Sequence, residues 1–224
     1  AECRAGNIDI FNPSTVDHVS QIRQAVQRGR LDATIKVNAS PVASSQFMVF
    51  NWNKASDPFK QSLFRSDKFR RAMSHLVNRQ AVIDIVYGGL GTPMYSSVYP
   101  VLTQWINPKV PKYEYDPKHA AKLLAELGFT KKDREGYLVD SKGRRIEFNL
   151  ATNAGNTQRE QIAKLIVDEA KKVGVKVNFQ AIDFNTLVGQ LLSSGPDRPF
   201  DAIIIGLTGG GLDWPFGSNV VPCK

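Results

Sequence analysis

The chain has 224 residues, of which 42% are hydrophobic and 22% charged, enough for one large globular domain or two small ones. No run approaches the roughly 18 uncharged apolar residues that a membrane-spanning helix needs. The formal net charge of +8 would suit a nucleic-acid or anionic-lipid partner. However, the basic residues are scattered and no aromatic residues interleave with them, which favours a generally basic, solvated surface.

Both ends of the sequence are typical of the interior of a longer protein. The N-terminal residues AECRAGNIDI lack the basic start and apolar core of a signal peptide. The two cysteines, Cys3 and Cys223, stand at opposite ends, which excludes a zinc knuckle and a CxxC redox site. They are either one disulfide closing nearly the whole chain or two unrelated thiols, because geometry decides between these. We therefore expect the chain to be a fragment.

The first quarter of the sequence predicts one helix and three strands. Residues 6–10 suggest a turn followed by a strand. Apolar residues at helical spacing over 16–28 predict an amphipathic helix that ends at Gly29. Residues 34–37 are rich in β-branched side chains, and 46–53 have the composition of a second strand.

Residues 67–100 predict a pair of short helices followed by an extended segment. One face of the first helix is apolar, and Asn78 is a natural N-cap for the second. Gly88 and Gly89 would end the second helix in a left-handed conformation. Pro93 then favours an extended exit, because the residue before a proline avoids the helical region.

The middle of the chain alternates between helical and strand patterns. Residues 105–113 are too rich in proline and aromatic residues for long regular structure. Asp116 and Pro117 are a strong start signal for a helix that Gly128 would terminate. Residues 136–140 and 145–151, separated by Ser-Lys-Gly, predict a β-hairpin.

The last third predicts a strand–helix–strand unit over 146–179, with a long helix over 156–173. A further amphipathic helix is expected over 184–192, and the apolar run 200–205 is typical of a strand covered on both faces. These patterns indicate an α/β, or mixed α+β, fold with a mixed β-sheet flanked by helices. We expect a single domain, with residues 55–115 as a helical flank or insertion.

The stretch GLTGGGLDWPFGSN at 206–219 has chemistry that folding alone does not require. It follows a buried strand, and ligands bind beyond the carboxyl ends of strands in open sheets. Its glycines allow close backbone approach, while Thr208, Asp213 and Trp214 offer a hydroxyl, a charge and a flat apolar surface. A phosphate loop would need a following Gly-Lys-Ser/Thr, which is missing. A merely flexible loop is the remaining alternative.

The sequence gives little support for catalysis or metal binding. His18, His75 and His119 lie on three different predicted helices, and no HExxH or GxSxG motif occurs. We therefore expect no enzyme activity, no catalytic residues, no metal ligands and no cofactor. Two other classes stay open, namely a small hydrolase or transferase and a basic nucleic-acid- or anion-binding module. Aromatic candidates for a ligand cleft, or else for packing, are Trp52, Tyr95, Tyr99 and Trp105.

Several motifs in the right order resemble the family 5 extracellular solute-binding proteins, the oligopeptide, dipeptide and nickel binders of ABC importers. The family pattern "pF.D.rvRqAl..aiDr..i...v..G.g.pa....P" is matched by Pro58-Phe59, Asp67, Phe69-Arg70-Arg71-Ala72, Asn78-Arg79, Ile83, Val86, Gly89, Gly91, Pro93 and Pro100. Asn78 replaces the family's common Asp, and either residue caps a helix. YDPKHAAKLLAELGF also matches the family's "yDp.kAk.LL.eaGf", and the resemblance spans about residues 6 to 219.

The resemblance implies a periplasmic-binding-protein-like lobe of type II architecture. Residues 1–224 would form the second, C-terminal lobe, and the first lobe would be absent from this chain. The implied protein is a monomeric substrate-binding component of an ABC transporter that binds a peptide-like or other small solute and delivers it to a membrane permease. It would bind no nucleic acid. It would act in the periplasm or outside the cell, or tethered to the outer face of the cytoplasmic membrane.

The resemblance also implies where the ligand binds. Thr208, Gly209, Gly210, Asp213 and Trp214 are expected to line one wall of the cleft. Gly210 stands where the peptide binders usually carry the aspartate that pairs with the peptide ammonium group, and Leu207 replaces their usual tryptophan. These departures argue against a simple dipeptide specificity, and the identity of the ligand stays open.

Overall fold

The computed structural model describes residues 5, 7–13, 15–36, 44–195 and 197–208. The helices are α1 (Val16–Gln27), α2 (Pro58–Arg65), α3 (Asp67–His75), α4 (Arg79–Tyr87), the 3-10 turn η1 (Thr103–Trp105), α5 (Pro117–Glu126), α6 (Thr157–Val173) and α7 (Phe184–Leu192). The strands are β1 (Ser44–Phe50), β2 (Lys131–Lys132), β3 (Leu138–Val139), β4 (Glu147–Asn153), β5 (Lys176–Ile182) and β6 (Ala202–Thr208). In this part of the chain, none of the helices is long and apolar enough to cross a bilayer.

Local capping signals set the ends of the helices that the sequence predicts. The Asn78 side chain accepts a hydrogen bond from the Ala81 amide at 3.0 Å and begins α4. Gly88 ends the same helix with a φ of 56°, which a residue with a Cβ would adopt only with strain. Asp116 caps α5 in the same way as Asn78 caps α4, with a proline at the first helical position. The helices predicted over 16–28, 67–87, 156–173 and 184–192 are all confirmed.

A four-stranded mixed sheet with the order β1-β6-β4-β5 forms the centre of the molecule. β4 runs parallel to both β5 and β6, while β1 is antiparallel to β6 with Ser44 opposite Thr208. The β4–α6–β5 unit confirms the strand–helix–strand prediction for 146–179. The observed class is therefore the predicted one, a mixed sheet flanked by helices.

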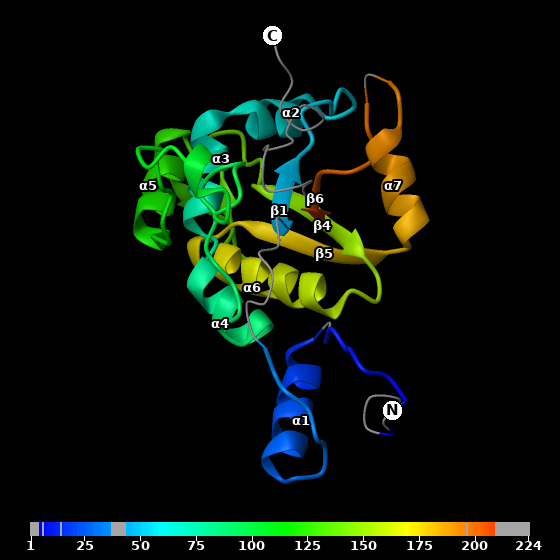
Figure 1. Ribbon diagram of the computed structural model, residues 1–224. Coiled ribbons are helices and arrows are strands. Elements are labelled where there is room, and N and C mark those ends of the chain that lie inside the picture. The colour runs from blue at the N-terminus through cyan, green and yellow to red at the C-terminus, as the bar shows by residue number, and fades with distance from the viewer. Residues whose placement is uncertain (1–4, 6, 14, 37–43, 196, 209–224) are drawn as a thin grey trace.

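The sheet has a thick helical layer on one face and a single helix on the other. Figure 1 shows α3 and α5 on one side of the strands and α7 on the opposite side. The larger core centres on four phenylalanine rings whose centroids lie 5.2 to 6.3 Å apart, contributed by Phe50, Phe64, Phe69 and Phe148. The smaller core packs the buried Leu187 of α7 against the other face of the sheet. Burial of both faces explains the continuous apolar run in β6.

Three predicted strand assignments differ from the structure. Residues 7–10 and 34–36 form no strand, because in the described residues no neighbouring strand offers them hydrogen bonds. Residues 138–139 pair with β2, and the hairpin predicted over 136–140 and 145–151 is limited to the antiparallel bridge between Val139 and Arg145. Alternate residues of the second segment, including Phe148, instead face the main core, which draws β4 into the large sheet.

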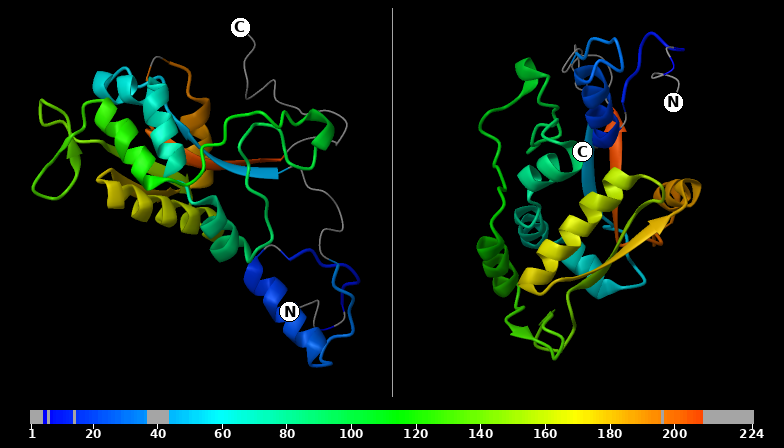
Figure 2. Two further views of the ribbon diagram at one scale, coloured as in Figure 1. Left: turned by 90° about the vertical axis from the view of Figure 1, so that its left-hand side faces the viewer. Right: turned by 90° about the horizontal axis from the view of Figure 1, so that it is seen from below.

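The α1 helix stands apart from the body of the molecule. It contains no buried residue, and Figure 1 and the left view of Figure 2 show it projecting away from the sheet and its covering helices. By contrast, α2, α3 and α4 contribute buried residues to the larger core. The assignment of residues 55–115 as a flank of one lobe remains a prediction.

Candidate functional site

The predicted ligand loop leaves the sheet at the end of β6. Because β4, β5 and β6 are parallel, their carboxyl ends share one edge of the sheet, which also holds the start of antiparallel β1. We call this the carboxyl edge, and Thr208 is the β6 residue that ends there. The other predicted site residues lie outside the described part of the chain, as do both cysteines: Gly209, Gly210, Asp213, Trp214, Cys3 and Cys223.

Arg159 lies at the carboxyl edge and is held by two amide side chains. It sits in the first turn of α6, whose N-cap Asn156 follows β4 closely. Its Nη1 donates to Asn153 Oδ1 at 2.6 Å, and its Nε donates to Gln46 Oε1 at 2.8 Å. The guanidinium group therefore bridges the end of β4 and the start of β1, directly beside the last residues of β6.

The backbone of Gly206 makes room for this bridge. A Cβ built on Gly206 would lie 2.6 Å from Gln46 Nε2 and 2.7 Å from Arg159 Nη2. Real Cβ atoms do not approach polar atoms this closely, so any other residue would push the bridge aside. Glycine at 206 therefore permits the close approach of Arg159 to the sheet.

Within the described part of the chain, the hydrogen-bond partners of Arg159 are neutral. Among the residues that the structure describes, no carboxylate forms an ion pair with it. Burial lowers the pKa of the Arg159 guanidinium, and nearby Tyr87 opposes that shift. The pKa of the Tyr87 phenol is raised by burial, against the lowering influence of Arg159. A half-buried cation with neutral partners is well suited to bind an anionic group.

A second segment reaches the carboxyl edge through Tyr99. This tyrosine is buried with Leu102 in a small separate core, and its hydroxyl donates to the Leu207 carbonyl oxygen at 3.4 Å. Figure 2 shows the surrounding segment alongside the ends of β1 and β6. Among the aromatic candidates from the sequence, Trp52 lies at the opposite end of β1, beneath the Arg70 guanidinium at 4.6 Å.

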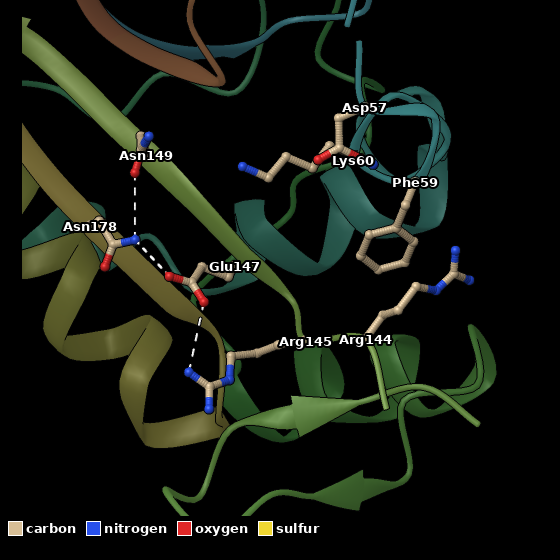
Figure 3. A pocket seen from close by; sticks show the side chains of 8 residues that line it. All are labelled: Asp57, Phe59, Lys60, Arg144, Arg145, Glu147, Asn149 and Asn178. Atoms are coloured by element: carbon tan, nitrogen blue, oxygen red, sulfur yellow. Dashed lines mark hydrogen bonds and ion pairs between the residues drawn. The ribbon is translucent and has the colours of Figure 1, made fainter. Parts of the chain in front are cut away.

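An open hollow of about 450 Å³ lies at the other edge of the sheet, where β4 and β5 begin. Most of its charged groups are already paired, including Lys60 with buried Asp201 at 2.7 Å and Arg145 with Glu147 at 3.7 Å, while Asp57 caps α2. Figure 3 shows Asn178 between Asn149 and Glu147. Because these groups satisfy each other, we interpret the hollow as a surface feature of the ion-pair network and not as the ligand site.

The histidines offer no metal site. His18 lies in α1, whereas His75 and His119 pack edge to face with ring centroids 4.7 Å apart. The His75 Nδ1 lies 2.6 Å from the Glu114 carbonyl oxygen. The described residues include no cluster of three histidine, cysteine, aspartate or glutamate side chains that could hold a metal ion.

Sequence reasoning missed Arg159, Gln46 and Asn153 as site residues. The sequence marks these residues only weakly. Their spacing from the predicted strand ends is not unusual, and the three residues come from separate parts of the chain. The one usable sign was positional: Arg159 follows a predicted strand by a few residues and opens a helix.

Comparison with known proteins gives consistent relatives. The family model for bacterial extracellular solute-binding proteins, family 5 (middle region), matches residues 1–220. A probable ABC transporter-binding protein of Deinococcus radiodurans is 51% identical over all of this chain, which spans 38% of that protein. The oligopeptide-binding protein AppA of Bacillus subtilis is 31% identical over 92% of this chain, which spans 35% of AppA. Its structure in complex with a nonapeptide matches with a TM-score of 0.69 and 28% identity over 92% of this chain and 38% of that one.

Proposed function

Because the chain belongs to family 5 of the bacterial extracellular solute-binding proteins, which bind solutes and are not enzymes, we propose that it supplies one wall of a ligand cleft. In this proposal it is the second lobe of the substrate-binding component of an ABC importer. The chain spans well under half the length of its relatives, so the opposite wall would come from the rest of the protein. The cargo would be a peptide-like or other small solute passed to a membrane permease.

The observation that carries the proposal is Arg159 at the carboxyl edge, which has only neutral hydrogen-bond partners among the described residues. Ligands of open α/β sheets bind at this edge, and the predicted loop 208–214 starts there. A guanidinium group can bind a carboxylate through two parallel hydrogen bonds, so we assign it to an acidic group of the ligand. The similarity to AppA, whose solved complex contains a nonapeptide, supports a peptide carboxylate as that group.

Transport requires that ligand binding change the shape of the protein. Contacts made only when the lobes are closed shift a pre-existing open–closed equilibrium toward the closed state. The cargo-loaded closed form would then dock on the permease outside the cytoplasmic membrane. Arg159 and the loop residues Asp213 and Trp214 would supply this lobe's share of those contacts.

The test uses the full-length gene product. Native mass spectrometry of gently purified protein identifies any co-purified solute, and calorimetry then measures its affinity, with peptides, sugars and metal chelates as further probes. Arg159→Gln should weaken binding of an acidic ligand about tenfold or more, because it removes a charged hydrogen bond. The control Arg144→Gln changes an arginine of the opposite edge and should leave affinity unchanged. Equal affinity in both variants would exclude Arg159 from the site.

Two further variants examine the predicted loop separately. Asp213→Ala and Trp214→Ala should each weaken binding in the full-length protein by about tenfold, the loss expected for one charged or aromatic contact. If both variants bind like the unmodified protein, the loop does not line the site. The Arg159 result stands or falls independently of that outcome.

A further inference from the structure

The connection between α4 and α5, residues 88–115, is long and has little regular structure. It contains the 3-10 turn η1 and no strand. Connections longer than about 15 residues are uncommon in compact domains and usually have a function of their own. Buried Tyr99 and Leu102, with Met94 and Val98 packed on them, give this connection a small core that is separate from the two cores of the sheet. The connection therefore depends on a few specific contacts for its position on the lobe.

Arg79 holds the outgoing and the returning halves of this connection. Its Nε donates to the Met94 carbonyl oxygen at 3.1 Å, and its Nη1 donates to the Tyr113 carbonyl oxygen at 3.0 Å. Its Nη2 donates to Ser74 Oγ at 3.0 Å, which ties the guanidinium group to α3. The guanidinium carbon also lies 5.0 Å from the centroid of the Tyr95 ring. One side chain therefore fixes both ends of the connection to the helical layer.

The stability of α4 does not account for Arg79. It is the first residue of that helix, where the helix dipole disfavours a positive charge. Burial lowers the pKa of its guanidinium group, and nearby Tyr95 opposes that shift. Its hydrogen-bond partners in the described part of the chain are neutral oxygen atoms. A planar fork of donors is suited to bind several carbonyl oxygens at once, so these contacts indicate that the residue serves the connection.

At its far end, the connection reaches the carboxyl edge through Tyr99. The hydroxyl of this residue donates to the Leu207 carbonyl oxygen, one residue before the end of β6 and the start of the predicted loop. β6 pairs with β4 at Ala202 and Ile203, so its last residues have β1 alone as a neighbouring strand. In the left view of Figure 2, the connection runs out to the ends of β1 and β6 and back. A shift of the connection would therefore release a contact that supports the end of β6.

We propose that Arg79 is a positioning residue for the ligand wall. It fixes the base of the connection, and the small core of the connection carries that position to Tyr99. Tyr99 in turn holds the end of β6 from which the predicted loop starts. Arg79 itself lies outside the site and would not touch the ligand. The importance of this arrangement for binding rests on the proposed function, whereas the contacts themselves can be tested without a solute.

Hydrogen exchange in the full-length gene product, with no solute added, tests this series of contacts. Arg79→Lys keeps the charge but loses the fork of donors, so the hydrogen-bonded amides of Leu102 and Trp105 should exchange about tenfold faster. The amides of residues 205–208 should exchange about fivefold faster, the effect expected for one lost hydrogen bond. Exchange in β4 should stay unchanged, whereas a residue that merely stabilised the fold would alter β4 as well. Unchanged exchange at 205–208, or equal acceleration in β4, would overturn the proposal.

Tyr99→Phe separates the two steps, because it keeps the buried ring and removes only the hydroxyl. It should speed exchange at 205–208 about fivefold and leave Leu102 unchanged. Adding Arg79→Lys to this variant should cause no further acceleration at 205–208, because both residues act through one contact. A product of the two effects, about 25-fold, would show that Arg79 acts by another route and would overturn the proposal.

A matched control is Arg71→Lys, the same change on the neighbouring helix α3. The Arg71 guanidinium carbon also lies near the connection, 5.6 Å from the Tyr113 ring centroid, but its ion pair is with Asp67 of its own helix. Its exchange pattern should match that of the unmodified protein. If Arg79→Lys does not fold, Ser74→Ala removes one acceptor of Arg79 and should give the same pattern with smaller effects. Failure to detect any bound solute would refute the proposed function and leave these exchange results unaffected.

Discussion

Among the polar groups of the lobe, the carboxylate of Asp201 should be the one whose removal lowers the stability of the fold most. Its side chain is 4% exposed, with Oδ2 2.7 Å from Lys60 Nζ and Oδ1 3.5 Å from Lys54 Nζ. Oδ2 also accepts a hydrogen bond from the Asn149 amide at 3.0 Å. Asp201→Ala would leave that amide without its acceptor and both lysines without their anion.

We expect this substitution to lower the free energy of unfolding by about 3 kcal/mol, toward the lower end for a broken buried pair, because both lysines can still reach water. For a chain of this size, that loss corresponds to a fall in melting temperature of about 6 to 12 °C. Asp201→Asn keeps an acceptor for the Asn149 amide, so its free energy of unfolding should lie between those of the unmodified protein and Asp201→Ala. Urea unfolding and calorimetry of the 224-residue chain give both quantities.

A matched ion pair on the surface supplies the control. Glu126 lies 2.9 Å from Lys68 Nζ, nearly the same separation, but its side chain is 42% exposed. Glu126→Gln should leave the unfolding midpoint unchanged, since water screens such pairs. A loss below about 1 kcal/mol for Asp201→Ala, or equal losses for the two variants, would refute the reasoning from burial.

Three other predictions concern the same chain. Gly206→Ala should lower the free energy of unfolding by less than about 1 kcal/mol in urea titrations, because the Gln46 and Arg159 atoms that its Cβ would displace are the far ends of flexible side chains. Phe148→Ala should lower it by about 3 to 5 kcal/mol, because a fully buried ring leaves the aromatic cluster. Burial opposes ionisation of Glu147, but hydrogen bonds from Asn178 and Lys176 outweigh it and lower the pKa below its ordinary value of 4.5. The resulting stabilisation is complete above that value and is lost as the pH falls below it, so Glu147→Gln should flatten the stability curve between about pH 5 and about pH 3.

Most helices of this lobe could be predicted because their signals are local. Asn78, Asp116 and the glycine after α4 act on their own neighbours, so the sequence around them is sufficient. The parallel β4–α6–β5 unit could also be predicted from the sequence, since a single crossover helix connects the two adjacent strands. The strands expected at 6–10 and 34–37 do not form over the described residues 7–10 and 34–36, because an alternating pattern reveals no pairing partner.

The sequence could predict the position of the ligand loop in the candidate site but not the side chains around Arg159, because only the first depends on local signals. The position of the ligand loop follows from a buried strand and the rule for carboxyl ends, so Thr208 could be placed at an edge from sequence. The bridge from Arg159 to Gln46 joins groups far apart in the chain. It depends on the pairing of β1 with β6, and the sequence contains no local signal for that register.

The position of β6 within the sheet affects how the lobe folds during its synthesis. β6 is the last strand in the described sequence, yet it lies between β1 and β4. During synthesis, β1 therefore leaves the ribosome long before β6 has been made. While β4, α6 and β5 assemble, the backbone groups of β1 lack the strand that they will pair with. Closing such a distant pairing is slow, since the intervening chain loses entropy before the contact forms. The nascent chain should consequently depend on chaperones until β6 has been synthesised, with β1 as the segment they protect.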